Sequence, residues 1–486
     1  NSYLAQLALA SQARQMKFQD SGREIGSTAL GKLILSNACP QLKEEIAFSD
    51  NWRKSYLGYF AKVAKLELET DHSAFEIAAN GLEQFEKSVF LDDGRNLKDA
   101  VTNAWRLNKS DVALVVVKGH GQTKTPNIET ASLIRDHLAE PGVSDLLENL
   151  DSSAINQHLL IALAGGAEYS PARVWLDWGG RVAIVARSRP ELWSELISRA
   201  RASSGTLLVP VLKSKAGNLD LQNISDTDLA NVAGLDLVED VEAIAGWLSM
   251  LARTESGDLI LGSFAYAPGV KHIEVQAAQH ALARVMTESL PKNRVTLTWL
   301  ATPTDSYAVS SDFLTDIDER YKARSVRVKI RDFIFGVKRH EPELFTSAMG
   351  QKYVLIDSTS VLQGPSYALA KRLQRWMAYQ QVLAGRNIAY LVSPPAKTHS
   401  VLDTRILRAT YSGAPHFGLV PFEVDRAVEL SAGLLLASLN SPRRQSPRTS
   451  YQDLAVHGGL WRLIYSPETV WRAATIRGLF GYFNKP

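Results

Sequence analysis

Cysteine is almost absent from this sequence. The 486 residues contain one, Cys39, so the chain cannot form a disulfide within itself, and a disulfide-stapled secreted scaffold is excluded. This usage is typical of a reducing compartment, and we expect the protein to be cytoplasmic. Cys39 lies in LSNACPQL with no histidine near it in sequence, so we expect a buried structural thiol rather than a nucleophile.

Long hydrophobic runs are also missing. A membrane-spanning helix needs about 18 or more consecutive apolar residues, and candidates such as 432–439 are less than half that length. The sequence therefore predicts no membrane span. The patterns HExxH, CxxC, DxDxDG and GxSxG do not occur either, so we predict no metal site and no hydrolase of the nucleophile-elbow type.

No sign of charge dominates the chain, which carries 54 Lys and Arg against 51 Asp and Glu. The segment from Arg331 to Pro486 is nevertheless basic, with 19 Lys and Arg against 10 Asp and Glu. Such a segment can meet the phosphates of a cofactor, an acyl carrier or a nucleic acid. Because its basic residues are scattered and lack an interleaved aromatic ladder, we expect a solvated surface and no nucleic-acid partner.

The pattern of the chain changes near residue 150. Residues 1–150 repeat apolar side chains at three- and four-residue spacing, which predicts a mainly helical N-terminal region with a candidate strand at 112–117. Residues 441–486 begin with a Pro/Ser/Arg-rich linker and continue as an aromatic, basic C-terminal helical tail. We expect this tail to dock on its own domain or on a partner subunit, so a homo-oligomer or a partner protein is possible.

Residues 151–440 alternate short apolar runs with amphipathic helices. This order is typical of a parallel sheet covered on both faces, and we expect a doubly wound, Rossmann-like α/β fold with an insertion at 305–350. We expect strands at 158–164, 181–187, 206–212, 258–264, 295–301, 352–357 and 387–393.

The first expected strand leads into a glycine-containing turn. Open α/β sheets bind ligands at the carboxyl ends of their strands, and Gly165, Gly166 and Ser170 lie where the backbone can approach a pyrophosphate. The turn is not GxGxxG, because Tyr169 and Pro171 interrupt it. The alternative is a tight strand–helix turn with no ligand.

The second expected strand ends at Arg187 and Ser188. An acidic residue at this point accepts the ribose hydroxyls of NAD, whereas an arginine favours the 2′-phosphate of NADP. If a dinucleotide binds, we therefore expect NADP(H). The alternative is that these side chains simply cover a solvated strand end.

A candidate catalytic group follows in 357–376. Tyr367 and Lys371 are four residues apart, so on a helix at 366–384 they lie on one face. An ammonium near a phenol favours the phenolate and lowers its pKa, which suits a proton donor or acceptor. Ser358 and Ser360 lie at a strand end, where a hydroxyl can hold a substrate oxygen. The alternative is a packed Tyr and a surface Lys.

The arrangement resembles the short-chain dehydrogenase/reductase superfamily over roughly 155–400. That family has a strand ending in Ser, then Tyr-x-x-x-Lys on a helix, then a strand ending in a Pro-containing loop with Thr, which SPPAKT up to Thr398 resembles. The resemblance implies Tyr367 as acid/base, Lys371 as ribose ligand and pKa partner, and Ser358 or Ser360 as the residue that orients the substrate.

The expected function is therefore NADPH-dependent reduction of a small-molecule or carrier-bound carbonyl, acyl or polyketide-like. The chain departs from the family at the glycine turn, in the short Ser-to-Tyr spacing and in an additional strand at 295–301. These departures keep a second hypothesis open, a degenerate Rossmann scaffold or subunit without catalysis. A methyltransferase is a third, less favoured because no acidic residue begins the first loop.

Overall fold

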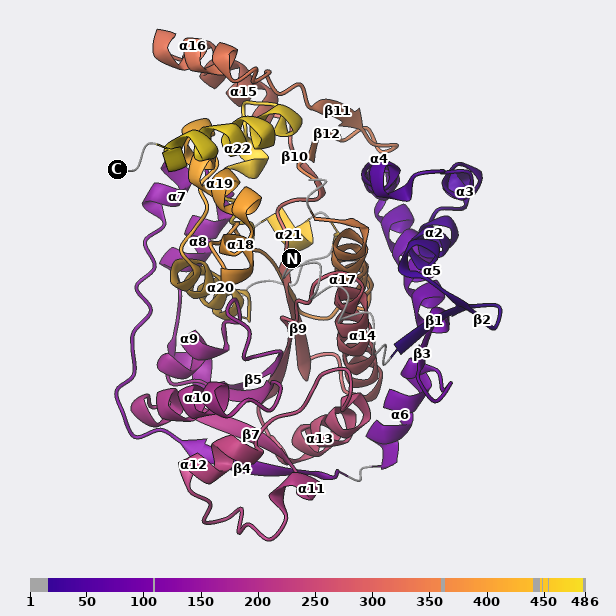
Figure 1. Ribbon diagram of the computed structural model, residues 1–486, viewed down its shortest axis with the longest axis vertical. Coiled ribbons are helices and arrows are strands. Elements are labelled where there is room, and N and C mark those ends of the chain that lie inside the picture. Colours follow the sequence, from indigo (N-terminus) through magenta and orange to yellow (C-terminus); the bar gives the residue numbers. More distant parts are fainter. Residues whose placement is uncertain are drawn as a thin grey trace.

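The computed structural model describes residues 16–107, 110–359, 363–439, 446–447, 449–452 and 454–483 (Figure 1). A seven-stranded, mostly parallel sheet lies at its centre, with helices on both faces. This confirms the predicted α/β class. From one edge to the other the strands are β13 (Ile388–Val392), β9 (Val295–Ala301), β8 (Asp258–Ser263), β5 (His158–Leu163), β6 (Arg181–Val185), β7 (Thr206–Leu212) and β4 (Val112–Lys118).

The strand order reverses at β5. Six strands run parallel, and in chain order they begin with β5, which lies between β6 and β8. The chain first builds outward through β6 to β7, then returns to the other side of β5 and builds through β8 and β9 to β13. The candidate strand near 112–117 joins this sheet as β4, antiparallel to β7.

Two hydrophobic cores sandwich the sheet, because successive residues of a strand face opposite sides. Leu159 and Ile161 of β5 belong to one core, and Leu160 and Ala162 to the other. The first face is covered by α13 (Val241–Thr254), α14 (Lys271–Ser289) and α17 (Pro365–Leu383). The second is covered by α9 (Ala172–Asp177), α10 (Pro190–Ala202) and α20 (Val424–Leu439).

The N-terminal helices form a further layer outside α13, α14 and α17 (Figure 1). Their apolar stripes face inward, and the hydroxyl of Thr70 caps the helix that begins at Asp71 by accepting from Ser73 N at 2.9 Å. The elements of this layer are β1 (Met16–Asp20), β2 (Arg23–Ile25), α2 (Ser27–Ala38), η1 (Pro40–Leu42), α3 (Lys43–Ala47), α4 (Trp52–Glu69), α5 (Asp71–Ser88), β3 (Val89–Leu91) and α6 (Leu97–Leu107).

Short helices connect the larger elements on the second face and at the sheet edge. They are α7 (Ala131–Arg135), α8 (Gly142–Glu148), η2 (Ser153–Gln157), α11 (Lys213–Ala216) and α12 (Asp226–Val232).

The predicted insertion is a separate antiparallel sheet with two helices. It contains β10 (Ser306–Ser310), α15 (Phe313–Lys322), α16 (Val326–Ile334), β11 (Glu343–Thr346) and β12 (Lys352–Asp357), with β12 in the middle. The prediction that 352–357 belongs to the parallel sheet was wrong, since Ile356 pairs antiparallel with Tyr307. A short apolar run does not reveal which sheet it will join, and this one joins the antiparallel sheet of the insertion.

The C-terminal segment closes the end of the molecule above the sheet. It comprises α18 (His399–Leu402), α19 (Arg405–Gly413), η3 (Ala414–Phe417), α21 (Thr449–Gln452), η4 (Leu460–Arg462) and α22 (Pro467–Phe483). Helices α19 and α22 touch through glycines: a Cβ on Gly413 would lie 1.9 Å from Ala474 O, and one on Gly478 1.8 Å from Ala409 O. Only glycine permits this close backbone approach, so the tail docks on its own chain.

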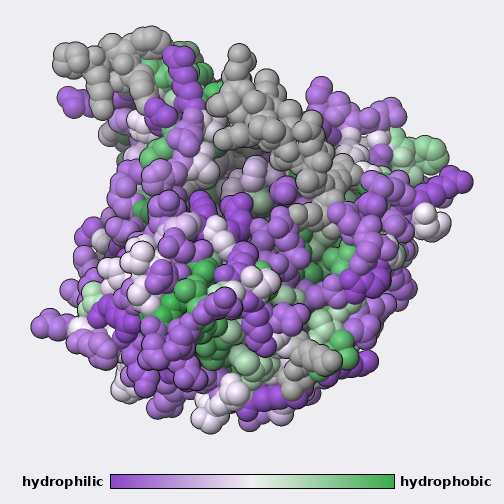
Figure 2. Space-filling view, turned by 60° about the horizontal axis from the view of Figure 1, so that its bottom comes forward, coloured by the Kyte–Doolittle hydropathy of each residue, from purple (hydrophilic) through white to green (hydrophobic). Residues whose placement is uncertain are grey.

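The outer surface is mostly hydrophilic, with a patch of hydrophobic residues near the middle of the face in Figure 2. Within the part of the chain that is described, no helix combines the length and the apolar character that crossing a membrane requires.

Candidate active site

A cleft of about 440 Å³ opens at the carboxyl ends of β5, β8, β9 and β13. We call it the sheet-end cleft. It lies where the strand order reverses, between β5 and β8. Its polar lining includes Ser263, Thr302, Tyr367, Lys371 and Thr398, and residues of α19 and α22 line it too. The sequence-predicted residues Tyr367, Lys371 and Thr398 therefore share one cavity.

Helix α17 presents Tyr367 and Lys371 to this cleft. The helix begins after Gly364, whose φ is +77°, with Pro365 in its first turn, a residue whose fixed φ suits that position. The Lys371 ammonium lies 5.6 Å from the centre of the Tyr367 ring. It donates to Leu300 O at 2.8 Å and to Gln374 Oε1 at 3.3 Å. Since an ammonium has three hydrogens, one is left for a ligand.

Burial sets the protonation of both groups. It lowers the pKa of Lys371 to about 8, because a charge is costly away from water. It raises the pKa of Tyr367, although a hydrogen bond with Thr302 acts in the opposite direction. The lysine was expected to lower the phenol's pKa. Burial raises it instead, so Tyr367 is held as a neutral phenol that can donate a proton.

Two further rings hold Tyr367 in place. The rings of His272 and Tyr266 have centroids 5.1 Å and 6.2 Å from that of Tyr367. His272 is buried, its Nδ1 lies 3.1 Å from Ala267 O, and burial together with the charge of Lys371 lowers its pKa to about 3. It is therefore neutral at physiological pH and acts as packing for the phenol.

The hydroxyl beside Tyr367 comes from Thr302. The sequence makes 302–312 a candidate cleft segment because it follows a strand end, although a polar capping loop is the favoured interpretation. β9 ends at Ala301, and Thr302 follows directly. The threonine lines the cleft and its hydroxyl lies 2.5 Å from that of Thr304. The signal that points to Thr302 is its place directly after β9. Because β12 belongs to the insertion, β9 is the last strand of the parallel sheet before α17 along the chain.

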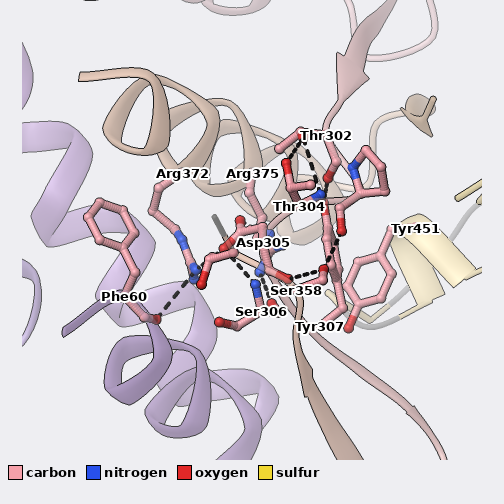
Figure 3. A network of polar contacts seen from close by, with 12 residues as sticks. Phe60, Thr302, Thr304, Asp305, Ser306, Tyr307, Ser358, Arg372, Arg375 and Tyr451 are labelled. Carbon is pink, nitrogen blue, oxygen red and sulfur yellow. Dashed lines mark hydrogen bonds and ion pairs between the residues drawn. The ribbon is translucent and has the colours of Figure 1, made fainter. Parts of the chain in front are cut away.

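Ser358 lies elsewhere. Its buried hydroxyl is 2.6 Å from Pro303 O and 3.1 Å from Asp305 O, so it supports the loop after β9 from behind (Figure 3). It is not part of the cleft lining. The other predicted serine, Ser360, lies outside the described residues.

A buried ionic cluster supports the same loop (Figure 3). Asp305 Oδ1 lies 2.8 Å from Arg372 Nη2, and Asp305 Oδ2 lies 2.9 Å from Arg375 Nη2. Glu67 of α4 binds Arg372 from the other side at 3.0 Å and accepts from Trp376 Nε1 at 2.7 Å. The cluster therefore joins the N-terminal layer, the loop after β9 and helix α17.

The glycine turn after β5 is packed against protein. A Cβ on Gly165 would lie 2.9 Å from Ala162 Cβ, and one on Gly166 would lie 2.6 Å from Leu192 Cδ2. Both glycines thus permit the turn to pack on its own core. Ser170 is buried, and its hydroxyl accepts from the backbone N of Ala172, the first residue of α9, at 3.3 Å.

The residues between these positions reach into the cleft. Tyr169 lines it and donates its hydroxyl to Pro394 O at 2.8 Å, joining the loops after β5 and β13. Glu168 Oε2 accepts from the backbone N of His399 at 3.0 Å. Tyr169 therefore fills part of the space above the first strand–helix turn.

Arg187 and Ser188 lie at the end of β6, outside the lining of the cleft. Both are exposed. Ser188 Oγ lies 2.8 Å from Lys215 Nζ and 3.3 Å from Gly234 O. Lys215 of α11 thus brings a second cation to this strand end, which its sequence position did not reveal.

Among the described residues, no three His, Cys, Asp or Glu side chains are grouped so that they could hold a metal ion. Comparison of the chain with protein-family models, with curated proteins and with solved structures found no match.

Proposed function

We propose that the protein is an NADPH-dependent carbonyl reductase of the short-chain type, with its active site in the sheet-end cleft. The observation that carries this proposal is the convergence of Thr302, Tyr367 and Lys371 on one cavity at the reversal of strand order. Numbered along the chain, the six parallel strands follow the order 3-2-1-4-5-6, which is that of dinucleotide-binding Rossmann domains.

The chain's own groups would handle the substrate oxygen and its proton. Thr302 and Tyr367 would hold the carbonyl oxygen, and Tyr367 would donate its phenolic proton as the oxygen gains negative charge. Burial keeps Tyr367 a neutral phenol with a proton to give, although its raised pKa also makes it a weaker acid. Bound NADPH would supply the hydride. Lys371 would bind the ribose hydroxyls with its remaining hydrogen.

The cofactor fits one half of the site better than the other. Lys371, Thr398 and Ser263 line the cleft together and would surround the nicotinamide riboside. At the other end, Arg187, Ser188 and Lys215 suit a 2′-phosphate. Between these two ends, the pyrophosphate of the cofactor fits poorly. Pro171 has no N–H to donate, α9 is six residues long, and Tyr169 covers the turn. We infer that Tyr169 turns away when the pyrophosphate binds.

The lining favours a neutral, largely apolar substrate. The charged side chains among its described residues are Glu168, which pairs with His399, and Lys371. An anionic substrate would need further cations. Phe264, Leu407 and Trp471 supply apolar surface, so a hydrophobic ketone, free or borne on a carrier, suits the cleft.

The second candidate is a subunit that binds a small apolar ligand without catalysis. It is favoured by the bridge from Tyr169 to Pro394, which crosses the place where a dinucleotide would lie.

Replacement of single phenols separates the two functions. We expect Tyr367→Phe to lower kcat for NADPH-dependent reduction of hydrophobic ketones by about 10²-fold or more, because general acids contribute about 10²–10⁴-fold. Ligand binding, followed through quenching of tryptophan fluorescence, should change little. Tyr411→Phe removes another phenol from the same cleft and should change kcat less than about tenfold. Equal effects of the two variants would remove Tyr367 from its role.

A further inference from the structure

Helix α16 carries its apolar face outward. Val326, Ile330, Phe333 and Ile334 are 55–87% exposed, and their spacing places them on one side of the helix. Figure 1 shows α16 at the extreme end of the molecule, projecting beyond α15 and α22. Four large apolar side chains thus meet solvent together on a single protruding helix.

The inward side of α16 is ionic. Asp332 is the buried residue of this helix. Its carboxylate lies 2.5 Å from both Arg324 Nη1 and Arg331 Nη2 and accepts from the Tyr465 hydroxyl at 2.9 Å. The Arg331 guanidinium lies 4.7 Å from the Phe417 ring. Polar contacts therefore fix the helix with its apolar side turned out, the reverse of an ordinary surface helix.

The rim of this apolar face is strongly basic. Residues 322–339 contain seven Lys and Arg and one acidic residue, which is already bound to two arginines. Arg327, Lys329 and Lys338 are exposed. The guanidinium of Arg472 on α22 lies near Gly336, where α16 ends. A partner that covers the apolar residues must therefore also accommodate several cations.

We propose that α16 docks the protein on an anionic membrane surface. An amphipathic helix that lies in a lipid interface presents large apolar side chains to the acyl boundary and Lys or Arg to the headgroups. The outward face of α16 has both features, and the absence of a spanning helix from the described residues is compatible with peripheral binding. The sheet-end cleft is lined in part by Trp471 of α22, and the neighbouring Arg472 lies near the end of α16. On the proposed function, docking would bring this cleft near lipid-dissolved substrates.

Vesicle binding tests the proposal on the whole chain. In sedimentation at low salt we expect the protein to bind vesicles of phosphatidylcholine with phosphatidylserine at least tenfold more strongly than phosphatidylcholine alone. Ile330→Glu with Phe333→Glu, or Arg327→Glu with Lys329→Glu, should each weaken binding at least tenfold. These positions are exposed, so the fold, checked by circular dichroism, should persist. Phe48→Glu changes an exposed aromatic of the N-terminal layer and should have no effect.

A dye at position 333 reports insertion directly. Cys39 is buried, and burial raises its thiol pKa to about 12, so a Phe333→Cys variant can be labelled selectively with an environment-sensitive fluorophore. We expect its emission to shift to the blue with anionic vesicles, and that of a labelled Phe48→Cys variant to stay unchanged. Equal vesicle binding by the wild type and the Phe333→Glu variant would overturn the proposal. The proposal would also be overturned if the wild type bound no vesicles and light scattering showed a dimer that the Phe333→Glu substitution dissociates.

Discussion

Replacing Asp305 with Asn tests the buried ionic cluster beneath the sheet-end cleft. The carboxylate binds Arg372 at 2.8 Å and Arg375 at 2.9 Å, and all three side chains are buried. Arg372 keeps a second carboxylate, Glu67. Arg375 keeps Ser306 O at 2.9 Å and the Tyr307 ring at 4.0 Å, neither of which carries charge. Loss of the Asp305 charge therefore affects Arg375 most.

The magnitude follows from the charge left behind. Two guanidinium groups and two carboxylates balance in the native cluster, and Asp305→Asn leaves one positive charge uncompensated. Removing one partner of a buried ion pair costs about 3–5 kcal/mol. Because Asn keeps an acceptor oxygen, we expect a value near the lower limit, about 3 kcal/mol, or roughly two orders of magnitude in the folded-to-unfolded ratio.

Urea unfolding followed by circular dichroism measures the change. We expect a lower midpoint for Asp305→Asn, and weaker ligand binding, because Thr302 and Thr304 lie on the same loop. Glu83→Gln breaks an exposed ion pair with Lys87 and should cost less than about 0.5 kcal/mol. A loss below about 1 kcal/mol for Asp305→Asn would refute the reasoning that the cluster depends on charge balance.

Two further predictions concern titration. Since burial lowers the pKa of Lys371 to about 8, its ammonium is present below that pH and lost above it. NADPH affinity should therefore fall as pH rises through 8 in the wild type and stay constant in Lys371→Arg, and an identical fall in both would contradict this role. Burial raises the pKa of Glu86, but His280, Arg284 and Lys98 outweigh it and lower the pKa from 4.5 to about 2. The folded-state value is the lower one, so Glu86 contributes stability above pH 4.5 that is lost as pH falls toward 2. Glu86→Gln should lower the free energy of unfolding at neutral pH by roughly 3 kcal/mol, with a smaller difference from wild type in acid. If the free energies of unfolding of Glu86→Gln and the wild type differed by the same amount at every pH, the assigned link between Glu86 ionisation and stability would be wrong.

The sequence was informative where local pattern decides structure. The runs at β5, β6, β7, β8, β9 and β13 predicted the six parallel strands, because strands buried on both faces are continuously apolar. Four-residue spacing placed Tyr367 and Lys371 on one face of a helix, and both line the cleft. Their chemical roles stay predictions.

Features that depend on long-range packing were beyond the sequence. The run at 352–357 looks like a central strand, yet its partner is β10. That misassignment favoured Ser358 over Thr302 as the hydroxyl that orients the substrate. The ionic cluster unites positions 67, 305, 372 and 375, and no local rule connects them. The bridge from Tyr169 to Pro394 joins residues 225 positions apart.

Calorimetric titration with NADPH tests the central claim, that the sheet-end cleft holds a dinucleotide beside Lys371. The account predicts binding to the wild type, tighter binding to Tyr169→Gly, which clears the turn, and binding at least tenfold weaker to Lys371→Met. Absence of heat with both the wild type and Tyr169→Gly, or equal affinity of Lys371→Met and the wild type, would contradict it.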